Sequence, residues 1–407
     1  MLSRRDLLKL GSAAALSLAL PGIGRGLRAH EPTASDDLDW DRILVLVELK
    51  GGNDGLNTVI PYADPLYPQL RTRIAIGRDQ VLRLSPQLGL NPRLHALMAA
   101  WEAKDMAIVL GCGYPQPNRS HFRGIDIWNT GSSSEEMLRE GWLARLLDGA
   151  QAHNPDNLLA HAVLWDKSDS VGHAGLGPLH GRDLQTLIME SPGEFMKRTR
   201  YVEAIPGEGR NPAHAHILNG LRSVVNSRNQ IAAVMAQGET TGDGFPNGRF
   251  GDQLRNTTTF ITAGARVPVY KLTLNGFDTH SGQRWHHERL LEQLGNGLAE
   301  FRKRCIAADV WDRVLVMTYS EFGRRAHDNA SGGTDHGTAA PHFLLGGKVK
   351  GGTLYGDQPA LDDLAYGDLK YTTDYRQMYQ TVAREWWRFG DKVLTTDSVK
   401  PLGAIRS

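Results

Sequence analysis

Residues 43–49 read ILVLVEL, and the stretch that follows at 50–57 reads KGGNDGLN. A continuous apolar run that ends at a Gly-rich turn is typical of a strand buried on both faces of a parallel sheet. The turn places Asp54 directly beyond the end of this strand. We therefore expect a central strand that leads into a polar loop.

The same pattern returns along the chain and alternates with helical periodicity. Further strands are predicted at residues 106–111, 267–274, 313–320 and 342–347. Helices are predicted at residues 93–105, 217–237 and 283–304. On the last of these, one face carries Leu290, Leu291, Leu294, Leu298 and Phe301. Strands that alternate with helices favour an α/β fold with a largely parallel sheet.

The domain organisation follows from the length and from one irregular region. A chain of 407 residues allows one large domain or two ordinary ones. Residues 141–212 are less regular and rich in Gly, Asp and His. We interpret them as insertions on the side of an active site, and we expect a single domain over residues 40–407.

The composition is that of a soluble globular protein. The chain has 46 basic and 45 acidic residues, and it is 22% charged and 41% hydrophobic. This balance argues against nucleic acid or an anionic membrane surface as the main partner. Two cysteines, Cys112 and Cys305, make no disulfide framework, and their spacing leaves open whether they pair.

The first thirty residues are expected to form an export signal. Residues 3–9, SRRDLLK, contain a pair of arginines, and the apolar stretch at 10–24 follows without any charge. This order predicts a twin-arginine signal over residues 1–30 with cleavage near Ala29. The alternative is an N-terminal amphipathic helix. The stretch is too short and too rich in Ala and Gly for a membrane span, so we expect a periplasmic or secreted protein.

Polar side chains follow each predicted strand. In an open α/β sheet, ligands bind beyond the carboxyl ends of the strands. Four of these strand ends supply carboxylates, imidazoles, an arginine or a hydroxyl, namely Asp54, Ser120, His121, Asp278, His280, Glu321, Arg324, Asp335 and His336. Their convergence on one edge predicts a functional site.

Several of these residues also have structural interpretations. Asp54 can simply fill a turn position. Asp278 and His280 are two positions apart, so both face the same way in an extended segment, which suits shared metal coordination. A capping Asp with a packed His before the helix at residue 283 is the alternative. Asp335 and His336 lie between glycines, which favours a functional role. His342 opens an apolar run, and both a buried histidine and a ligand remain open.

The donor types indicate a divalent metal. Carboxylates and imidazoles without thiolates favour zinc or manganese, and magnesium or calcium is also compatible. The candidate ligands are Asp54, Asp278, His280, Glu321, Asp335, His336 and His342. Seven ligands exceed the need of one ion, so the sequence predicts one or two ions. Paired metals suit in-line displacement at phosphorus or sulfur.

Such chemistry needs a nucleophile and a cation beside the metal. Ser120 precedes a helix-like segment, where the helix dipole and free N–H groups favour an anion. A plain N-cap serine is the alternative, and both roles can coexist. Arg119, Arg123 and Arg324 are candidate clamps for the anion.

The combination of these motifs resembles a known family. LVLVELKGGNDGLNTVIPY, SHFRGIDIWNTG, GFDTHSGQ and SEFGRRAHDNASGGTDHGTAAPHFLLGG together resemble the exported bacterial family called domain of unknown function 1501, over nearly the whole chain. That family is similar to the alkaline phosphatase and sulfatase superfamily. The resemblance implies a doubly wound α/β fold with helices on both faces of the sheet. It also implies a hydrolase site with one or two metals.

The resemblance also assigns roles to individual residues. Asp54 corresponds to the superfamily's first metal aspartate and Ser120 to its nucleophile. Asp278 with His280, and Asp335 with His336, correspond to its two Asp/His ligand pairs. The chain differs in having the D-x-H spacing where D-x-x-x-H is usual. Glu321 also stands at the strand end where the superfamily places its Asp-His motif.

The expected function is therefore an exported metal-dependent hydrolase of phosphate or sulfate esters, with a small molecule or a polymer as substrate. Ser120 would attack, and Arg324 would assist. A non-catalytic exported protein that keeps the hydrolase fold for binding or assembly is the alternative. The expected partners are the substrate and the twin-arginine export machinery.

Overall fold

The computed structural model describes residues 38–150, 155, 158–166, 173–181, 184–237, 244–389 and 399–406. The predicted export signal at residues 1–30 lies outside these described residues. Across the described ranges, no helix combines the length and the apolar character that crossing a membrane requires.

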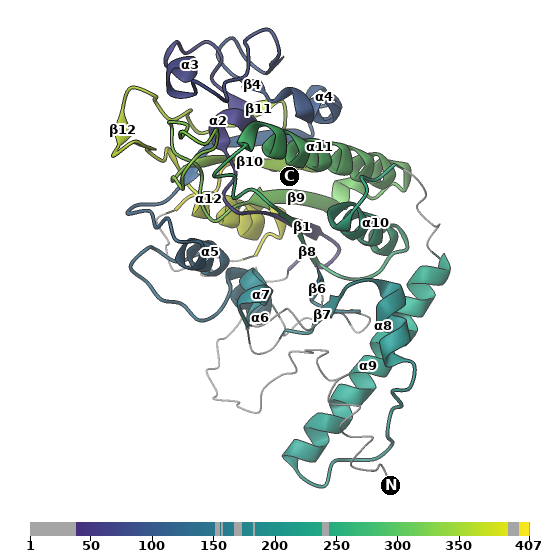
Figure 1. Ribbon diagram of the computed structural model, residues 1–407. Coiled ribbons are helices and arrows are strands. Elements are labelled where there is room, and N and C mark those ends of the chain that lie inside the picture. Colours follow the sequence, from purple (N-terminus) through teal and green to yellow (C-terminus); the bar gives the residue numbers. More distant parts are fainter. Residues whose placement is uncertain are drawn as a thin grey trace.

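A central sheet of nine strands organises the molecule (Figure 1). The strands are β1 (Ile43–Lys50), β5 (Met106–Gly113), β6 (Ala162–Trp165), β7 (Thr186–Met189), β8 (Val269–Asn275), β9 (Val314–Tyr319), β10 (Ala340–Leu345), β11 (Thr353–Tyr355) and β14 (Thr373–Asp374). Their order is β11-β5-β10-β9-β1-β8-β6-β7, and β14 also pairs with β5. All pairs are parallel except those of β10, which is antiparallel to β5 and β9. The predicted largely parallel sheet is confirmed.

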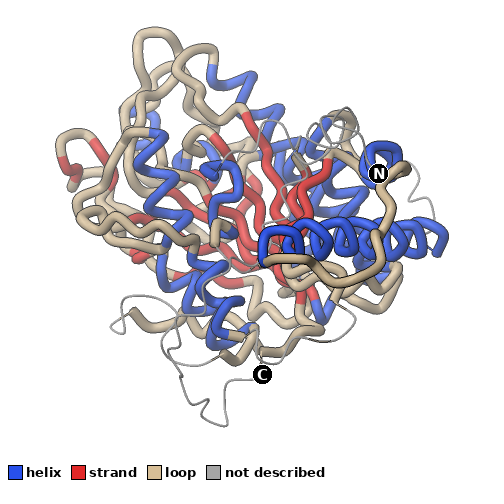
Figure 2. Tube along the Cα trace, turned by 90° about the horizontal axis from the view of Figure 1, so that it is seen from below, coloured by secondary structure: helices blue, strands red, loops and turns tan. Residues whose placement is uncertain are grey.

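Helices cover both faces of this sheet (Figure 2). The main ones are α5 (His121–Thr130), α6 (Trp142–Gly149), α10 (Arg249–Thr262), α11 (Gln283–Ala307) and α12 (Arg376–Gln380). Along β1, Val45 and Val47 join a core with α10 and α11, whereas Leu44 and Leu46 join a second core with α5, α6 and α12. This division explains why residues 43–47 are all apolar, because both faces of the strand are buried there. The predicted doubly wound α/β fold is confirmed.

Smaller elements surround these layers. They are α2 (Gly55–Thr58), β2 (Val59–Ile60), α3 (Leu66–Leu70), β3 (Leu82–Arg83), β4 (Gly89–Leu90), η1 (Pro92–Leu97), α4 (Met98–Glu102), α7 (His173–Leu176), η4 (Gly177–Leu179), α8 (Pro192–Thr199), α9 (Pro212–Gln237), η5 (Trp311–Arg313), β12 (Leu364–Ala365), β13 (Asp368–Leu369) and the π-helical η6 (Thr381–Trp386). Helix α9 extends away from the sheet, with α8 beside it (Figure 1).

Two regions differ from the prediction. Residues 141–212, which we expected to be insertions, contribute β6 and β7 to the central sheet. Residues 93–105 form a 3₁₀ turn and a short helix instead of one continuous helix. The two cysteines are buried free thiols.

One ion pair is buried within the sheet itself. Lys271 Nζ on β8 lies 2.8 Å from Glu48 Oε2 on the neighbouring β1, and both side chains are 6% exposed. Thr273 Oγ1 donates to the same carboxylate oxygen at 3.3 Å. Burial alone would raise the pKa of Glu48, but the charge and hydrogen bond of Lys271 outweigh it, and the pKa is lowered.

Candidate metal centre

Polar residues from three separate segments meet beyond the carboxyl ends of β1, β8 and β9. Asp278 and His280 follow β8, and His336 lies in the long loop after β9. His121 is the first residue of α5, the helix that follows β5. The strand-end arrangement predicted from the sequence therefore brings several of its residues together.

Glycines allow these segments to approach closely. Gly51, at the end of β1, has φ +118°, and a Cβ there would lie 2.4 Å from the Asp278 backbone nitrogen. A Cβ on Gly333 would lie 2.2 Å from the carbonyl carbon of His280. Side chains at either position would push apart the loops that carry Asp278, His280 and His336.

Three imidazole rings surround the carboxylate of Asp278. Its Oδ1 lies 3.0 Å from His280 Nε2 and 3.1 Å from His336 Nε2. Its Oδ2 lies 3.4 Å from His121 Nε2. The Nε2 atoms of His280 and His336 are themselves only 3.0 Å apart. We refer to His121, Asp278, His280 and His336 as the centre. The Asp278 and His280 side chains are both 46% exposed, so the centre is open to solvent.

The other nitrogen of each ring is held by an oxygen atom. His121 Nδ1 lies 2.9 Å from Glu321 Oε1, and His336 Nδ1 donates to the Arg119 carbonyl at 2.9 Å. His280 Nδ1 lies 3.4 Å from Asp335 Oδ1. A carbonyl or a carboxylate can only accept, so Nδ1 carries the proton in His121 and His336, whose Nδ1 contacts are hydrogen bonds. In a neutral ring the lone pair then lies on Nε2 and faces inward.

This donor set fits a divalent ion. The Nε2 lone pairs of His121 and His336 and the carboxylate of Asp278 face a common space, where without a cation they would repel one another. Ligands of tetrahedral zinc lie about 3.3 Å apart when each bond is about 2.0–2.1 Å. The closest contacts here are 3.0–3.4 Å. His121, Asp278 and His336 each offer one ligand atom, and these three atoms lie within 4.8 Å of one another.

The pKa values of the centre reflect these contacts. Partial burial alone would raise the pKa of Asp278, but the hydrogen bond and the charge of Arg324 lower it to about 2. The hydrogen bond to Glu321 raises the pKa of His121. Burial lowers the pKa of His336. Asp278 is therefore a carboxylate at any physiological pH.

Arg324 connects the loops beneath the centre. Its side chain is fully buried, and Nη2 donates to Asp278 Oδ1 at 2.8 Å. The remaining hydrogen bonds of this guanidinium go to backbone carbonyls of Gly51, Gly52, Phe277 and Thr334. All three of its nitrogens are thus occupied within the protein. The contacts indicate a residue that positions Asp278, whereas the sequence suggested an anion clamp.

Glu321 and Asp335 lie behind the rings that they contact. Glu321 is 3% exposed, and its Oε1 also accepts the backbone N–H of Gly51 at 2.8 Å. Asp335 is exposed and lies 3.4 Å from Asn329 Nδ2. In this arrangement both carboxylates hold an imidazole, although the sequence suggested them as direct ligands.

Asp54 is placed in a buried ion pair outside the group around Asp278. Its two oxygens accept from Arg71 Nη1 at 2.6 Å and Nη2 at 2.8 Å. Gln283 Nε2 also donates to this carboxylate. Burial would raise the pKa of Asp54, but the charge of Arg71 outweighs it and lowers the pKa.

His342 is also away from the group around Asp278. It lies on β10, is 0% exposed and packs its ring edge-on against Trp128 at 5.1 Å between centroids. Within the described part of the chain neither ring nitrogen has a hydrogen-bond partner. Burial lowers its pKa to about 3, so the ring is neutral. The structure thus matches the buried-histidine interpretation.

Ser120 is the N-cap residue of α5, between two residues that contact the centre. Arg119 accepts from His336 through its carbonyl, and the His121 ring faces Asp278. The Ser120 side chain is exposed and makes no capping hydrogen bond. Its hydroxyl is therefore available at the start of a ten-residue helix.

Sequence reasoning missed His121 as a candidate metal ligand. It noted NRSHF after the strand at 106–111 but chose Ser120 from that segment, because serine matched the nucleophile of the resembled superfamily. The signal was present, since an imidazole next to the expected nucleophile follows the same strand. Its contact with Glu321, 200 positions away, could not be read from local spacing.

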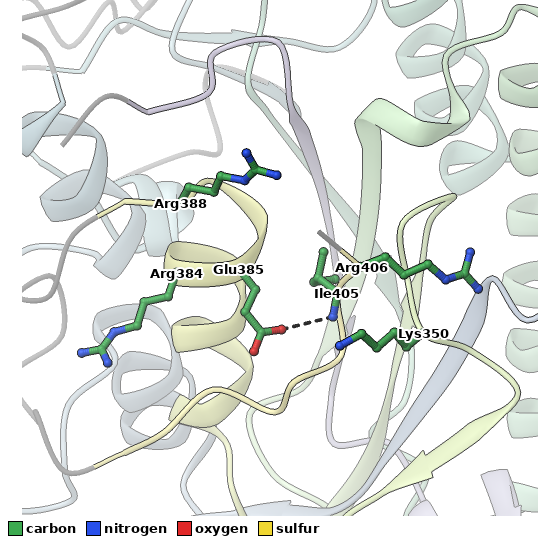
Figure 3. Close-up of a pocket in the computed structure, with 6 residues that line it drawn as sticks. All are labelled: Lys350, Arg384, Glu385, Arg388, Ile405 and Arg406. Carbon is green, nitrogen blue, oxygen red and sulfur yellow. Dashed lines mark hydrogen bonds between the residues drawn. The ribbon is translucent and has the colours of Figure 1, made fainter. Parts of the chain in front are cut away.

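A cavity of about 610 Å³ shares no residue with this centre. It is lined by Lys350, Arg384, Glu385, Arg388, Ile405 and Arg406. Glu385 accepts the backbone N–H of Ile405 at 3.1 Å, and the three arginine side chains point in different directions (Figure 3). These cations do not converge on one ligand position, so the cavity does not compete with the centre around Asp278.

Comparison with known proteins supports the motif resemblance. A family described as a protein of unknown function (DUF1501) matches residues 218–389. The DUF1501 resemblance is confirmed over these residues. The matched segment includes Asp278, His280 and His336 but not His121, which lies earlier in the chain. No match was found among curated proteins.

The fold is similar to those of solved structures. A protein in the alkaline phosphatase superfamily from Vibrio parahaemolyticus shares 10% identity at a TM-score of 0.39, covering 98% of this chain and 79% of that one. The phosphonate monoester hydrolase SpPMH from Silicibacter pomeroyi shares 10% identity at a TM-score of 0.38. The match covers 89% of this chain and 76% of that one. The zinc complex of the C-terminal periplasmic domain of EcEptC from Escherichia coli shares 10% identity at a TM-score of 0.35. The match covers 78% of this chain and 77% of that one.

Proposed function

We propose that the protein is an exported metal-dependent hydrolase that cleaves phosphate or sulfate esters, with Ser120 as the nucleophile. The observation that supports this most directly is the convergence of three imidazole Nε2 atoms on the carboxylate of Asp278. The Nδ1 atoms of His121 and His336 are hydrogen-bonded to oxygens, which is the arrangement that metal-binding histidines usually show.

The residues proposed to hold the ion are His121, Asp278, His280 and His336. Their mixed nitrogen and oxygen donors favour zinc or manganese. When bound, the ion supplies positive charge and Lewis acidity to the ester group. Glu321, Asp335 and the Arg119 carbonyl keep the Nε2 atoms facing inward.

Ser120 is suited to attack by its place at the start of α5. The free N–H groups of the first helical turn and the helix dipole favour the negative charge of the ester. The serine oxygen forms a bond to phosphorus or sulfur while the bond to the ester's alcohol oxygen breaks, and the alcohol leaves with the serine proton. Water then attacks the same atom, returns a proton to Ser120 and releases phosphate or sulfate.

Metal analysis of the folded protein and a screen of aryl phosphates, phosphodiesters and aryl sulfates test the proposal. Ser120→Ala should abolish turnover while metal content stays unchanged. Ser281→Ala is the matched control, because Ser281 is another exposed serine, next to His280. Unchanged turnover of Ser120→Ala would exclude Ser120. A metal-loaded protein that cleaves none of these esters would favour the non-catalytic alternative.

We also propose export by the twin-arginine machinery, on the sequence of residues 3–9 alone. Replacing Arg4 and Arg5 by lysine should leave the folded protein in the cytoplasm, as followed by cell fractionation. Export of the lysine variant at the normal level would exclude this route.

A further inference from the structure

The carboxylate of Asp54 already has a permanent cation beside it. Arg71 binds both of its oxygens, and the side chains of both residues are 0% exposed. A guanidinium does not lose its proton in proteins, so this charge is present at all working pH values. The pair is bidentate, which is the strongest arrangement for these two groups.

Arg71 is itself held in place from the opposite side. Its Nε donates to the Ala326 carbonyl at 2.7 Å, and Nη2 donates to the Arg325 carbonyl at 2.9 Å. The guanidinium thus bridges the end of β1 and the loop after β9. A metal ion at Asp54 would have to displace a buried cation with four hydrogen bonds.

Gln283 extends this pair to the loops that carry the candidate ligands. Its Nε2 donates to Asp54, and its Oε1 accepts from Thr279 Oγ1 at 3.0 Å and from Thr334 Oγ1 at 2.5 Å. Thr279 lies between Asp278 and His280 in the sequence, and Thr334 lies just before Asp335. All four polar residues of this chain of contacts are buried.

We propose that the Asp54–Arg71 pair takes the place of a second metal ion, and that it positions the two ligand-bearing loops through Gln283. The inference rests on the metal centre proposed above and adds that this centre holds one ion. The candidate ligands from the sequence thus separate into a metal-binding group around Asp278 and a charge pair at Asp54. Arg71 and Gln283 are positioning residues in this arrangement.

The metal content of the purified full chain tests the number of ions. After saturation with Zn²⁺ or Mn²⁺ and removal of the excess, elemental analysis should find one ion per chain. Asp278→Asn should lose this ion. Two ions per chain would overturn the inference and leave the hydrolase proposal standing, whereas no ion would overturn both.

Variants at Asp54 test whether it is a ligand. Asp54→Asn alone leaves Arg71 without its counter-charge, so a second variant, Asp54→Leu with Arg71→Met, removes both charges together. Either variant that folds should retain one ion per chain. Loss of that ion from a variant with an intact circular dichroism spectrum would overturn the inference.

The role of Gln283 is tested by metal affinity. Gln283→Ala should weaken Zn²⁺ binding by about 10-fold or more in a chelator competition, because outer contacts orient the ligands. Gln293→Ala on the same helix is the matched control, and it should bind as the parent does. Equal affinities of the two variants would overturn the positioning role.

Discussion

Glu321 Oε1 lies 2.9 Å from His121 Nδ1 and accepts the backbone N–H of Gly51 at 2.8 Å. One buried carboxylate oxygen therefore connects the first residue of α5 with the end of the central strand. It also determines which nitrogen of His121 carries the proton, because a carboxylate accepts and does not donate. The direction of the His121 lone pair depends on this contact.

We expect Glu321→Ala to weaken Zn²⁺ binding by about 10- to 100-fold, because the His121 ring loses its anchor. Glu321→Gln should cause a smaller loss, since the amide oxygen can still accept from Nδ1. Chelator competition measures both. Parent-like affinity in Glu321→Ala would show that this contact does not orient the ring.

Arg324→Met should reduce the free energy of unfolding by about 3–5 kcal/mol. The substitution leaves the carbonyls of Gly51, Gly52 and Thr334 without their Arg324 donor and Asp278 without its buried counter-charge. Urea denaturation measures the loss. The neighbouring Arg325→Met is the control, because Arg325 is 37% exposed and lies 3.6 Å from Asp368, a contact worth less than about 1 kcal/mol. Similar losses in both variants would contradict the proposed role of Arg324.

The stability of the protein should fall in mild acid partly because of His342. Its pKa is about 3 in the folded state, below the value of about 6.5 expected when unfolded. The unfolded chain therefore binds more protons between these two pH values. The contribution of the neutral His342 ring to the stability of the folded state is lost as the pH falls below about 6.5.

His342→Leu should accordingly reduce the stability loss between about pH 7 and about pH 4.5 by about 2–3 kcal/mol. Urea denaturation at several pH values measures this difference. The exposed His95→Leu should leave the pH dependence unchanged. An unaltered pH profile in His342→Leu would mean that the ring is not buried in neutral form.

Lys271→Met should destabilise the protein by about 3–5 kcal/mol, because it leaves Glu48 as an unpaired charge inside the sheet. The double variant Glu48→Leu with Lys271→Met should be closer to the parent, since the uncompensated charge is gone. A double-mutant cycle of unfolding free energies gives the coupling between the two residues. Additive losses would argue against a buried pair.

The fold could be predicted where apolar runs are long. Strands β1, β5, β8 and β9 were recognised because each is a run of six to eight residues, most of them buried. Strands β6 and β7 have four residues each and lie in a region rich in Gly, Asp and His, so periodicity gave no signal there. Long-range pairing with β8 places β6 in the sheet.

The sequence predicted where the candidate site lies better than it predicted which residues form it. Strand-end logic found Asp278, His280 and His336, because parallel strands deliver their carboxyl ends to one edge. The same logic could not tell that Arg71, 17 positions after Asp54, folds back onto that carboxylate. Pairings of this kind are set by tertiary contacts that leave no pattern in local sequence.

The candidate ligands are far apart in the chain, and this separation affects the order of assembly. His121 and the Glu321 that orients it are 200 positions apart, and the segments between them include β6, β7, β8 and β9 of the sheet. In the proposed metal centre the donors follow β5, β8 and β9, so the complete donor set exists only after these three strands have joined the sheet. If the protein crosses the membrane already folded, the metal that it carries is chosen by the pool available in the cytoplasm, before the compartment in which it works is reached.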